Sequence, residues 1–146
     1  MRRLSRTLDT LADTAALAAE VAPLLAPGGV LLLTGDLGAG KTTFVQALAR
    51  AYGIARTVTS PTFTLANVYP MPDGGTLVHA DLYRLASPEG LEDLGLLEAL
   101  ENGARLAIEW PERAQAALDR DMPRRLRLTL SADNEGKRQA MLEEEP

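Results

Sequence analysis

Residues 35–43 bring together the residue types that bind the phosphates of a nucleotide. Gly35 and Gly40 are separated by four residues, and Lys41 and Thr42 follow directly. Glycines let backbone N–H groups curl toward an anion, a lysine ammonium can reach the β- and γ-phosphates, and a threonine hydroxyl can bind Mg²⁺. This spacing predicts a phosphate-binding loop. The alternative is a glycine-rich turn that matches the pattern by chance.

The segments on either side of this loop favour the first interpretation. Residues 30–33 are a short, continuously apolar run, which is typical of a buried parallel strand. Residues 43–49 have helical periodicity, with Phe44 and Leu48 on one face. A loop between a strand and a helix N-terminus lies where the helix dipole attracts phosphate. We therefore expect nucleotide binding by Gly35, Asp36, Leu37, Gly38, Ala39, Gly40, Lys41, Thr42 and Thr43.

Two carboxylates follow apolar runs further along the chain. Asp81 comes after residues 77–80, and Glu109 comes after residues 106–108. A strand at either place delivers its carboxylate to the C-terminal edge of a parallel sheet, where ligands bind in such folds. One carboxylate can hold Mg²⁺, directly or through water, and the other can orient the attacking water; the two roles stay open. The alternative for each is a strand-end carboxylate that faces solvent.

Residues 58–65 contain a run of hydroxyl side chains around a proline. Such a run usually forms a surface loop. In a phosphate-loop protein, the same position after the first helix is also where a nucleotide-sensitive switch lies. On the residues alone, both interpretations of Ser60, Pro61 and Thr62 stay open.

Other single residues near these motifs have two interpretations each. His79, the only histidine, shares a strand face with Asp81 and can orient that carboxylate, although a structural hydrogen-bonding role is favoured. Trp110, the only tryptophan, can stack on a base, although packing in the core or against a partner is favoured. Tyr83 and Arg84 are either an exposed pair that senses phosphate or a partner, or a packed tyrosine beside a surface arginine.

Periodicity and turn signals predict the elements that must position these residues. We expect an edge strand at 2–8, a helix at 14–25, a hairpin of 63–69 with 76–83, a helix after Ser87, a strand at 106–109, a short helix at 113–118, and a hairpin of 126–130 with 138–142. Residues 143–145 are expected to be a solvated end. The residues expected to pack the helix after Ser87 against the sheet are Leu91, Leu94, Leu97 and Leu100. These elements predict an α/β fold: a three-layer, P-loop NTPase-like sheet with a mostly parallel core, antiparallel hairpin strands and helices on both faces.

Composition sets the broad class of protein. The chain has 146 residues, so residues 1–146 are expected to form one P-loop domain. It has no cysteine, no secretory signal and no apolar run of about 20 residues, which is typical of a cytoplasmic protein without a membrane span. The net charge of −5 argues against strong direct binding to nucleic acid.

Four motifs in this order and at this spacing resemble the TsaE (YjeE) family, small bacterial ATPases of threonylcarbamoyladenosine synthesis on tRNA. The resemblance covers nearly the whole chain, and none of the four motifs departs from the family pattern. The motifs are Gly35-Asp36-Leu37-Gly38-Ala39-Gly40-Lys41-Thr42-Thr43, Ser60-Pro61-Thr62-Phe63, His79-Ala80-Asp81-Leu82-Tyr83-Arg84 and Ile108-Glu109-Trp110-Pro111-Glu112.

The resemblance implies a protein that binds ATP with Mg²⁺ and hydrolyses it slowly. It implies docking on the TsaB–TsaD pair, which transfers a threonylcarbamoyl group to adenosine 37 of tRNAs reading ANN codons. The ATPase cycle would support repeated turnover by that assembly rather than perform the transfer. The chain would reach tRNA through this complex rather than by strong direct binding.

The resemblance also implies roles for matching residues. Thr42, Asp81 and Glu109 would serve the metal, and Lys41 would join the two carboxylates in catalysis. The segment 60–62 would act as a switch. Thr14, in the N-terminal region, would contribute to the nucleotide pocket.

Two other functions are alternatives on the residues alone. The first is a small kinase that transfers the γ-phosphoryl group to a metabolite, although no arginine-rich lid is evident after the second helix. The second is a non-catalytic switch that binds a partner when nucleotide is bound. Hydrolysis that is lost in Glu109→Ala separates an ATPase from such a switch.

Overall fold

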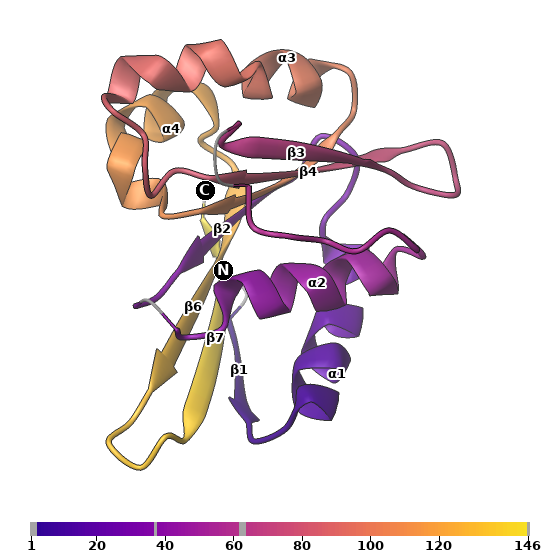
Figure 1. Ribbon diagram of the computed structural model, residues 1–146, viewed down its shortest axis with the longest axis vertical. Coiled ribbons are helices and arrows are strands. Elements are labelled where there is room, and N and C mark those ends of the chain that lie inside the picture. Colours follow the sequence, from indigo (N-terminus) through magenta and orange to yellow (C-terminus); the bar gives the residue numbers. More distant parts are fainter. Residues whose placement is uncertain (1–2, 37, 62–63, 146) are drawn as a thin grey trace.

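The computed structural model describes residues 3–36, 38–61 and 64–145 (Figure 1). In this part of the chain, helices separate the strands except at two hairpins, β3 with β4 and β6 with β7. The strands are β1 (Arg3–Leu8), β2 (Val30–Thr34), β3 (Ala66–Pro70), β4 (Thr76–Asp81), β5 (Arg105–Glu109), β6 (Arg125–Ala132) and β7 (Arg138–Glu145). The α-helices are α1 (Leu11–Val21), α2 (Lys41–Ala51), α3 (Leu96–Glu101) and α4 (Gln115–Asp121), and the 3₁₀ helices are Ala22–Leu24, Pro88–Leu94 and Pro111–Ala114.

The strands form one seven-stranded mixed sheet in the order β1-β7-β6-β2-β5-β4-β3. At its centre β2 pairs in parallel with β6 and β5, and β5 pairs in parallel with β4. Antiparallel pairs complete both edges, with β7 between β6 and β1 on one side and β3 against β4 on the other. The predicted α/β fold, the edge strand and both hairpins are confirmed.

Alternate residues of β2 contribute to two separate hydrophobic clusters, one on each face of the sheet. Leu31 and Leu33 pack in the cluster that contains residues of α1 and α2, including Phe44. Val30 and Leu32 pack in the cluster that contains residues of α3 and α4. Figure 1 shows these two pairs of helices on opposite sides of the sheet. Because both faces are covered, this strand is apolar without alternation.

Helix α1 begins three residues before the predicted start at Thr14. The Thr10 hydroxyl accepts a hydrogen bond from the Asp13 backbone N–H (3.2 Å), and the Asp13 carboxylate accepts one from the Thr10 N–H (3.0 Å). This reciprocal capping box satisfies two backbone donors that the first turn leaves without partners. The helix therefore starts at Leu11 and includes Thr14 in its buried face.

The segment after Ser87 is less regular than predicted. Pro88–Leu94 is a 3₁₀ helix, Gly95 has a φ of 68°, and α3 starts only at the next residue. This break changes which leucines face the sheet: Leu96 is 2% exposed, whereas Leu97 is 43% exposed. The prediction that Leu97 packs against the sheet is wrong, because one helical period does not continue through a left-handed glycine.

The C-terminal glutamates were predicted to be a solvated end, but they are part of β7. Glu145 accepts hydrogen bonds from Arg125 Nε and Arg127 Nε, each at 2.8 Å. Burial by itself would raise the pKa of the Glu145 carboxyl, but these two arginines outweigh it and hold that pKa below its ordinary value. The prediction failed because a run of like charges gave no sign that the neighbouring strand β6 supplies arginines.

Candidate active site

The loop between β2 and α2 joins a strand to a helix N-terminus, as predicted. Thr34 ends the strand and Lys41 begins α2, an 11-residue helix. Gly40 is the N-cap residue with a φ of 105°, a left-handed conformation that costs a residue with a Cβ about 1–2 kcal/mol. The backbone N–H groups of the first helical turn, which have no partner within the helix, can therefore bind an anion.

Gly35 lets this loop approach the neighbouring strand. A Cβ added at Gly35 would lie 2.5 Å from the carbonyl oxygen of Leu130 on β6, closer than real Cβ contacts come. The first glycine of the motif is thus required by packing against β6, in addition to any contact with phosphate.

Lys41 lies inside the loop with 5% of its surface exposed. Its ammonium donates hydrogen bonds to the carbonyl oxygens of Gly35 and Asp36, the latter at 3.1 Å, and lies 4.0 Å from the centroid of the Trp110 ring. Burial lowers the pKa of Lys41, and the carboxylates of Glu109, Glu112, Asp81 and Asp36 oppose that shift. The Lys41 ammonium is therefore a desolvated cation with several carboxylates nearby.

Thr42 and Glu109 contact each other across the site. The Thr42 hydroxyl lies 2.9 Å from Glu109 Oε2 and 3.2 Å from Oε1. The carboxylate is only 3% exposed, and its Oε2 also lies 2.5 Å from His79 Nε2. The histidine thus contacts Glu109, whereas the sequence had suggested Asp81 as the carboxylate it could orient.

Asp81 lies beside Glu109 because the register of β4 and β5 aligns the two residues. Its Oδ2 accepts a hydrogen bond from the Ser60 hydroxyl (3.2 Å), and its Oδ1 accepts one from the Tyr83 backbone N–H (3.0 Å). The predicted switch-like segment therefore touches a predicted metal ligand. Pro61 lines the same cavity.

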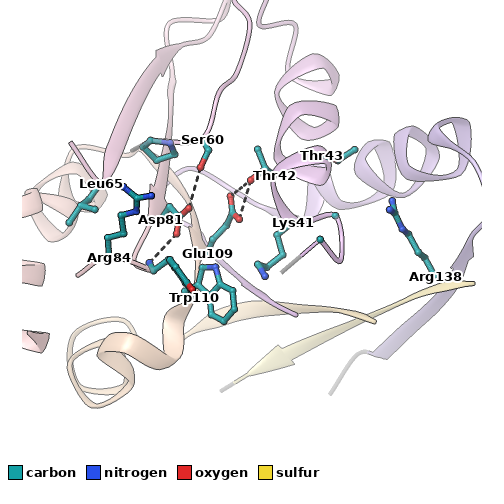
Figure 2. Close-up of a pocket in the computed structure, with 14 residues that line it drawn as sticks. Lys41, Thr42, Thr43, Ser60, Leu65, Asp81, Arg84, Glu109, Trp110 and Arg138 are labelled. Atoms are coloured by element: carbon teal, nitrogen blue, oxygen red, sulfur yellow. Dashed lines mark hydrogen bonds between the residues drawn. The ribbon is translucent and has the colours of Figure 1, made fainter. Parts of the chain in front are cut away.

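These side chains surround one cavity of about 410 Å³, shown in Figure 2. In that view Thr42 and Glu109 face each other, Ser60 approaches Asp81, and Arg138 lies on the far side of Lys41 from Asp81. The cavity is lined by Gly38, Gly40, Lys41, Thr42, Thr43, Ser60, Pro61, Leu65, Asp81, Tyr83, Arg84, Glu109, Trp110 and Arg138.

Two lining residues had no signal in the sequence. Arg138 comes from β7 near the C-terminus, and only the strand order brings it beside the loop. Leu65 has a φ of 61°, an unusual conformation for leucine, within the segment 63–69 that was expected to be a regular strand. That expected strand begins at Ala66 rather than at residue 63, which lies outside the described residues.

The aromatic part of the cavity depends on a second left-handed residue. Trp110 follows β5 with a φ of 57°, which ends the strand and puts the indole ring against Lys41. The Tyr83 ring lies 4.9 Å from the Trp110 ring, and the Arg113 guanidinium lies 5.3 Å from the Tyr83 ring. Tyr83 is 41% exposed, so it forms part of the open wall of the cavity.

Some predicted site residues lie elsewhere. Thr14 is buried on α1 and does not line the cavity. Gly35, Asp36 and Ala39 also do not line it, although the first two supply the carbonyls that hold Lys41. Leu37 and Thr62 lie outside the described residues.

The family model described as "Threonylcarbamoyl adenosine biosynthesis protein TsaE" matches residues 8–140. The chain belongs to the TsaE family. This range contains β2, the loop between β2 and α2, the carboxylates that end β4 and β5, and Arg138, so the whole cavity lies within the residues that the family model matches.

Individual relatives agree with this assignment. The chain is 45% identical over 118 residues to a tRNA threonylcarbamoyladenosine biosynthesis protein TsaE of Treponema pallidum, covering 81% of this chain and 84% of that protein. It is 47% identical over 108 residues to the Aquifex aeolicus protein of the same name, covering 73% and 75%. The crystal structure of YdiB from Bacillus subtilis has a TM-score of 0.77 and 30% sequence identity, covering 97% of this chain and 84% of that one.

The donor set of this TsaE family member fits a nucleotide-bound Mg²⁺ better than a metal held by protein alone. Within residues 3–36, 38–61 and 64–145, no three His, Asp or Glu side chains form a metal-binding group. Mg²⁺ in phosphate sites takes one or two protein ligands and fills its octahedron with phosphate oxygens and waters. The Thr42 hydroxyl and the Asp81 and Glu109 carboxylates can supply those ligands.

None of the helices that the structure describes has the length and apolarity needed to cross a membrane.

Proposed function

We propose that the chain is a Mg²⁺-dependent ATPase that serves the formation of threonylcarbamoyladenosine on tRNA. Membership of the TsaE family and the names of its relatives support the pathway. The fold supports nucleotide binding of the P-loop NTPase kind, because a glycine-rich loop joins a central parallel strand to a helix N-terminus.

One observation carries the ATPase proposal: Lys41, Thr42, Asp81 and Glu109 line the same cavity although they come from three different elements. Phosphoryl transfer needs little covalent chemistry from the protein. It needs positive charge on the phosphates, a held metal ion and an oriented water. These four side chains are the types that supply those functions.

Each of these residues has a role that its surroundings favour. Lys41 supplies a cation at the start of α2, where the backbone N–H groups also attract phosphate. Thr42 and Asp81 would hold Mg²⁺, which when bound neutralises charge on the phosphate oxygens. Glu109 would orient the attacking water and can share the metal through water.

The partner proposal rests on the family and on charge. We propose that the chain acts on the TsaB–TsaD pair and reaches tRNA through it, in the cytoplasm. The net charge of −5 and a pI near 4.9 oppose direct binding to a polyanion, because affinity for nucleic acid comes largely from Lys and Arg contacts to phosphates.

ATP hydrolysis by the purified chain tests the enzyme proposal. The chain has two lysines, so Lys41→Ala has a natural control in Lys137→Ala, which lies in the turn between β6 and β7. We expect hydrolysis to fall at least about 100-fold in Lys41→Ala and in Glu109→Gln, and to be unchanged in Lys137→Ala. Hydrolysis that survives in Lys41→Ala would contradict the proposal.

The same assay separates the two alternatives. The Glu109→Gln variant keeps the side-chain volume and should still bind ATP. If the variant binds ATP tightly without turnover while the wild type turns it over, a non-catalytic switch is excluded. Transfer of phosphate to a small molecule much faster than to water would instead favour a kinase.

A further inference from the structure

His79 is a buried histidine that contacts the cavity lining at Glu109. Its side chain is 0% exposed and does not line the cavity, whereas the Glu109 side chain does. The register of β4 and β5 aligns His79 with Ala107, so Glu109 is the diagonal neighbour two residues further along β5. Diagonal neighbours on one sheet face are within reach of long side chains, and the Nε2–Oε2 distance is 2.5 Å.

The hydrogen bond to Glu109 fixes which histidine nitrogen carries the proton. A carboxylate only accepts hydrogen bonds, so Nε2–H donates to Oε2. Nδ1 has no hydrogen-bond partner among the described residues. Nε2–H is therefore the His79 donor that contacts Glu109.

The two oxygens of Glu109 are held differently. Oε2 receives His79 Nε2–H and lies 2.9 Å from the Thr42 hydroxyl, whereas Oε1 has, among the residues that the structure describes, only the Thr42 hydroxyl, at 3.2 Å. A hydroxyl has one proton to donate, so Thr42 holds one oxygen at a time. If Thr42 turns to Mg²⁺, as its proposed role requires, His79 is the remaining anchor of this carboxylate.

We propose that His79 is a positioning residue for Glu109: its Nε2–H holds Oε2 so that Oε1 is presented to the water in the cavity. This inference rests on the proposed ATPase function and deepens it. A carboxylate fixed at one oxygen loses the rotational freedom of its χ angles, which favours a single productive geometry. Groups that orient metal-site ligands in this way typically contribute 10- to 100-fold to activity or metal affinity.

Kinetics of three variants test the proposal. We expect His79→Leu to lower kcat for Mg-ATP about 10- to 100-fold with KM within about twofold, because the nucleotide does not touch His79. His79→Gln, whose amide N–H can approximate Nε2–H, should recover most of kcat. In a Glu109→Gln background, His79→Leu should cause no additional loss. An additive loss, or an equal loss in His79→Leu and His79→Gln, would overturn the proposal.

A stability control separates positioning from folding. Tyr52→Phe removes another hydrogen bond in the core, from Tyr52 Oη to Ala22 O (2.9 Å), far from the cavity lining. It should lower the melting temperature and leave kcat unchanged.

A wild type that does not hydrolyse ATP refutes the proposed function, whereas an active wild type with an equally active His79→Leu refutes this inference alone.

A measurement without turnover tests the hydrogen bond itself. Because His79 is the only histidine, a tag-free chain labelled with [¹⁵N]histidine gives the signals of one imidazole. We expect a proton on Nε2 and a changed Nε2 signal in Glu109→Gln. An Nε2 without a proton, or signals indifferent to Glu109→Gln, would contradict the proposal.

Discussion

Replacing Gly35 by alanine should destabilise the fold more than replacing Gly136, a glycine in the turn between β6 and β7. A Cβ at this position would meet the Leu130 carbonyl oxygen at 2.5 Å and the Ala39 Cβ at 3.2 Å. Overpacking costs about 1–3 kcal/mol, and here the obstacle is backbone in the adjacent strand β6, which cannot rotate away. We therefore expect Gly35→Ala to lower the free energy of unfolding by about 3 kcal/mol.

Gly136→Ala is the matched control. Gly136 has a φ of 81° and no atom within 4 Å of an added Cβ, so its substitution costs only the left-handed conformation, about 1–2 kcal/mol. Urea denaturation followed by Trp110 fluorescence measures both variants. A loss in Gly35→Ala that is no larger than in Gly136→Ala would refute the close approach of the loop to β6.

Two predictions concern pH. The pKa of the Glu145 carboxyl is lowered, so this carboxylate contributes to stability above about pH 4.5. The contribution is lost as the pH falls through the pKa of Glu145 in the folded state. Acid titration of the free energy of unfolding should show this loss in the wild type and not in Glu145→Gln. Burial raises the pKa of Tyr52 to about 12 from 10.0, although Arg105 opposes this shift. Its contribution is complete below about pH 10 and is lost between pH 10 and 12, so the wild type should lose stability there more steeply than Tyr52→Phe; parallel slopes in the two proteins would contradict the assigned pKa.

The sequence predicted those parts of the fold whose causes are local. The glycine spacing of residues 35–40 and the apolar run before it predicted a loop between a strand and a helix, which the structure confirms. Both hairpins were predicted from turn residues. Asp81 and Glu109 were each predicted to end a strand at the C-terminal edge of the sheet, and the register of β4 and β5 aligns the two residues.

Features that depend on strand order were not predictable in this way. Arg138 reaches the cavity because β6 pairs with β2 and β7 pairs with β6, and Glu145 is paired because β6 supplies two arginines. His79 was expected near Asp81 from alternation along one strand. Its actual contact with Glu109 depends on the diagonal between β4 and β5, which requires the register of two strands.

The roles of the predicted site residues stay predictions. Lys41, Thr42, Asp81 and Glu109 lie together, which is the geometry that an ATPase needs, whereas Thr14 lies on α1 outside the cavity lining. For Thr14, the implied contact with nucleotide can be judged by comparing nucleotide affinity in Thr14→Val and wild type.

Reconstituted tRNA modification tests the central proposal most directly. The threonylcarbamoyladenosine formed per TsaB–TsaD pair would be measured over many turnovers, with wild type, Lys41→Ala or Lys137→Ala supplied as the third component. We predict that wild type and Lys137→Ala sustain product formation beyond one equivalent, and that Lys41→Ala does not. Repeated turnover with Lys41→Ala, or without any added chain, would contradict an ATPase that serves this reaction.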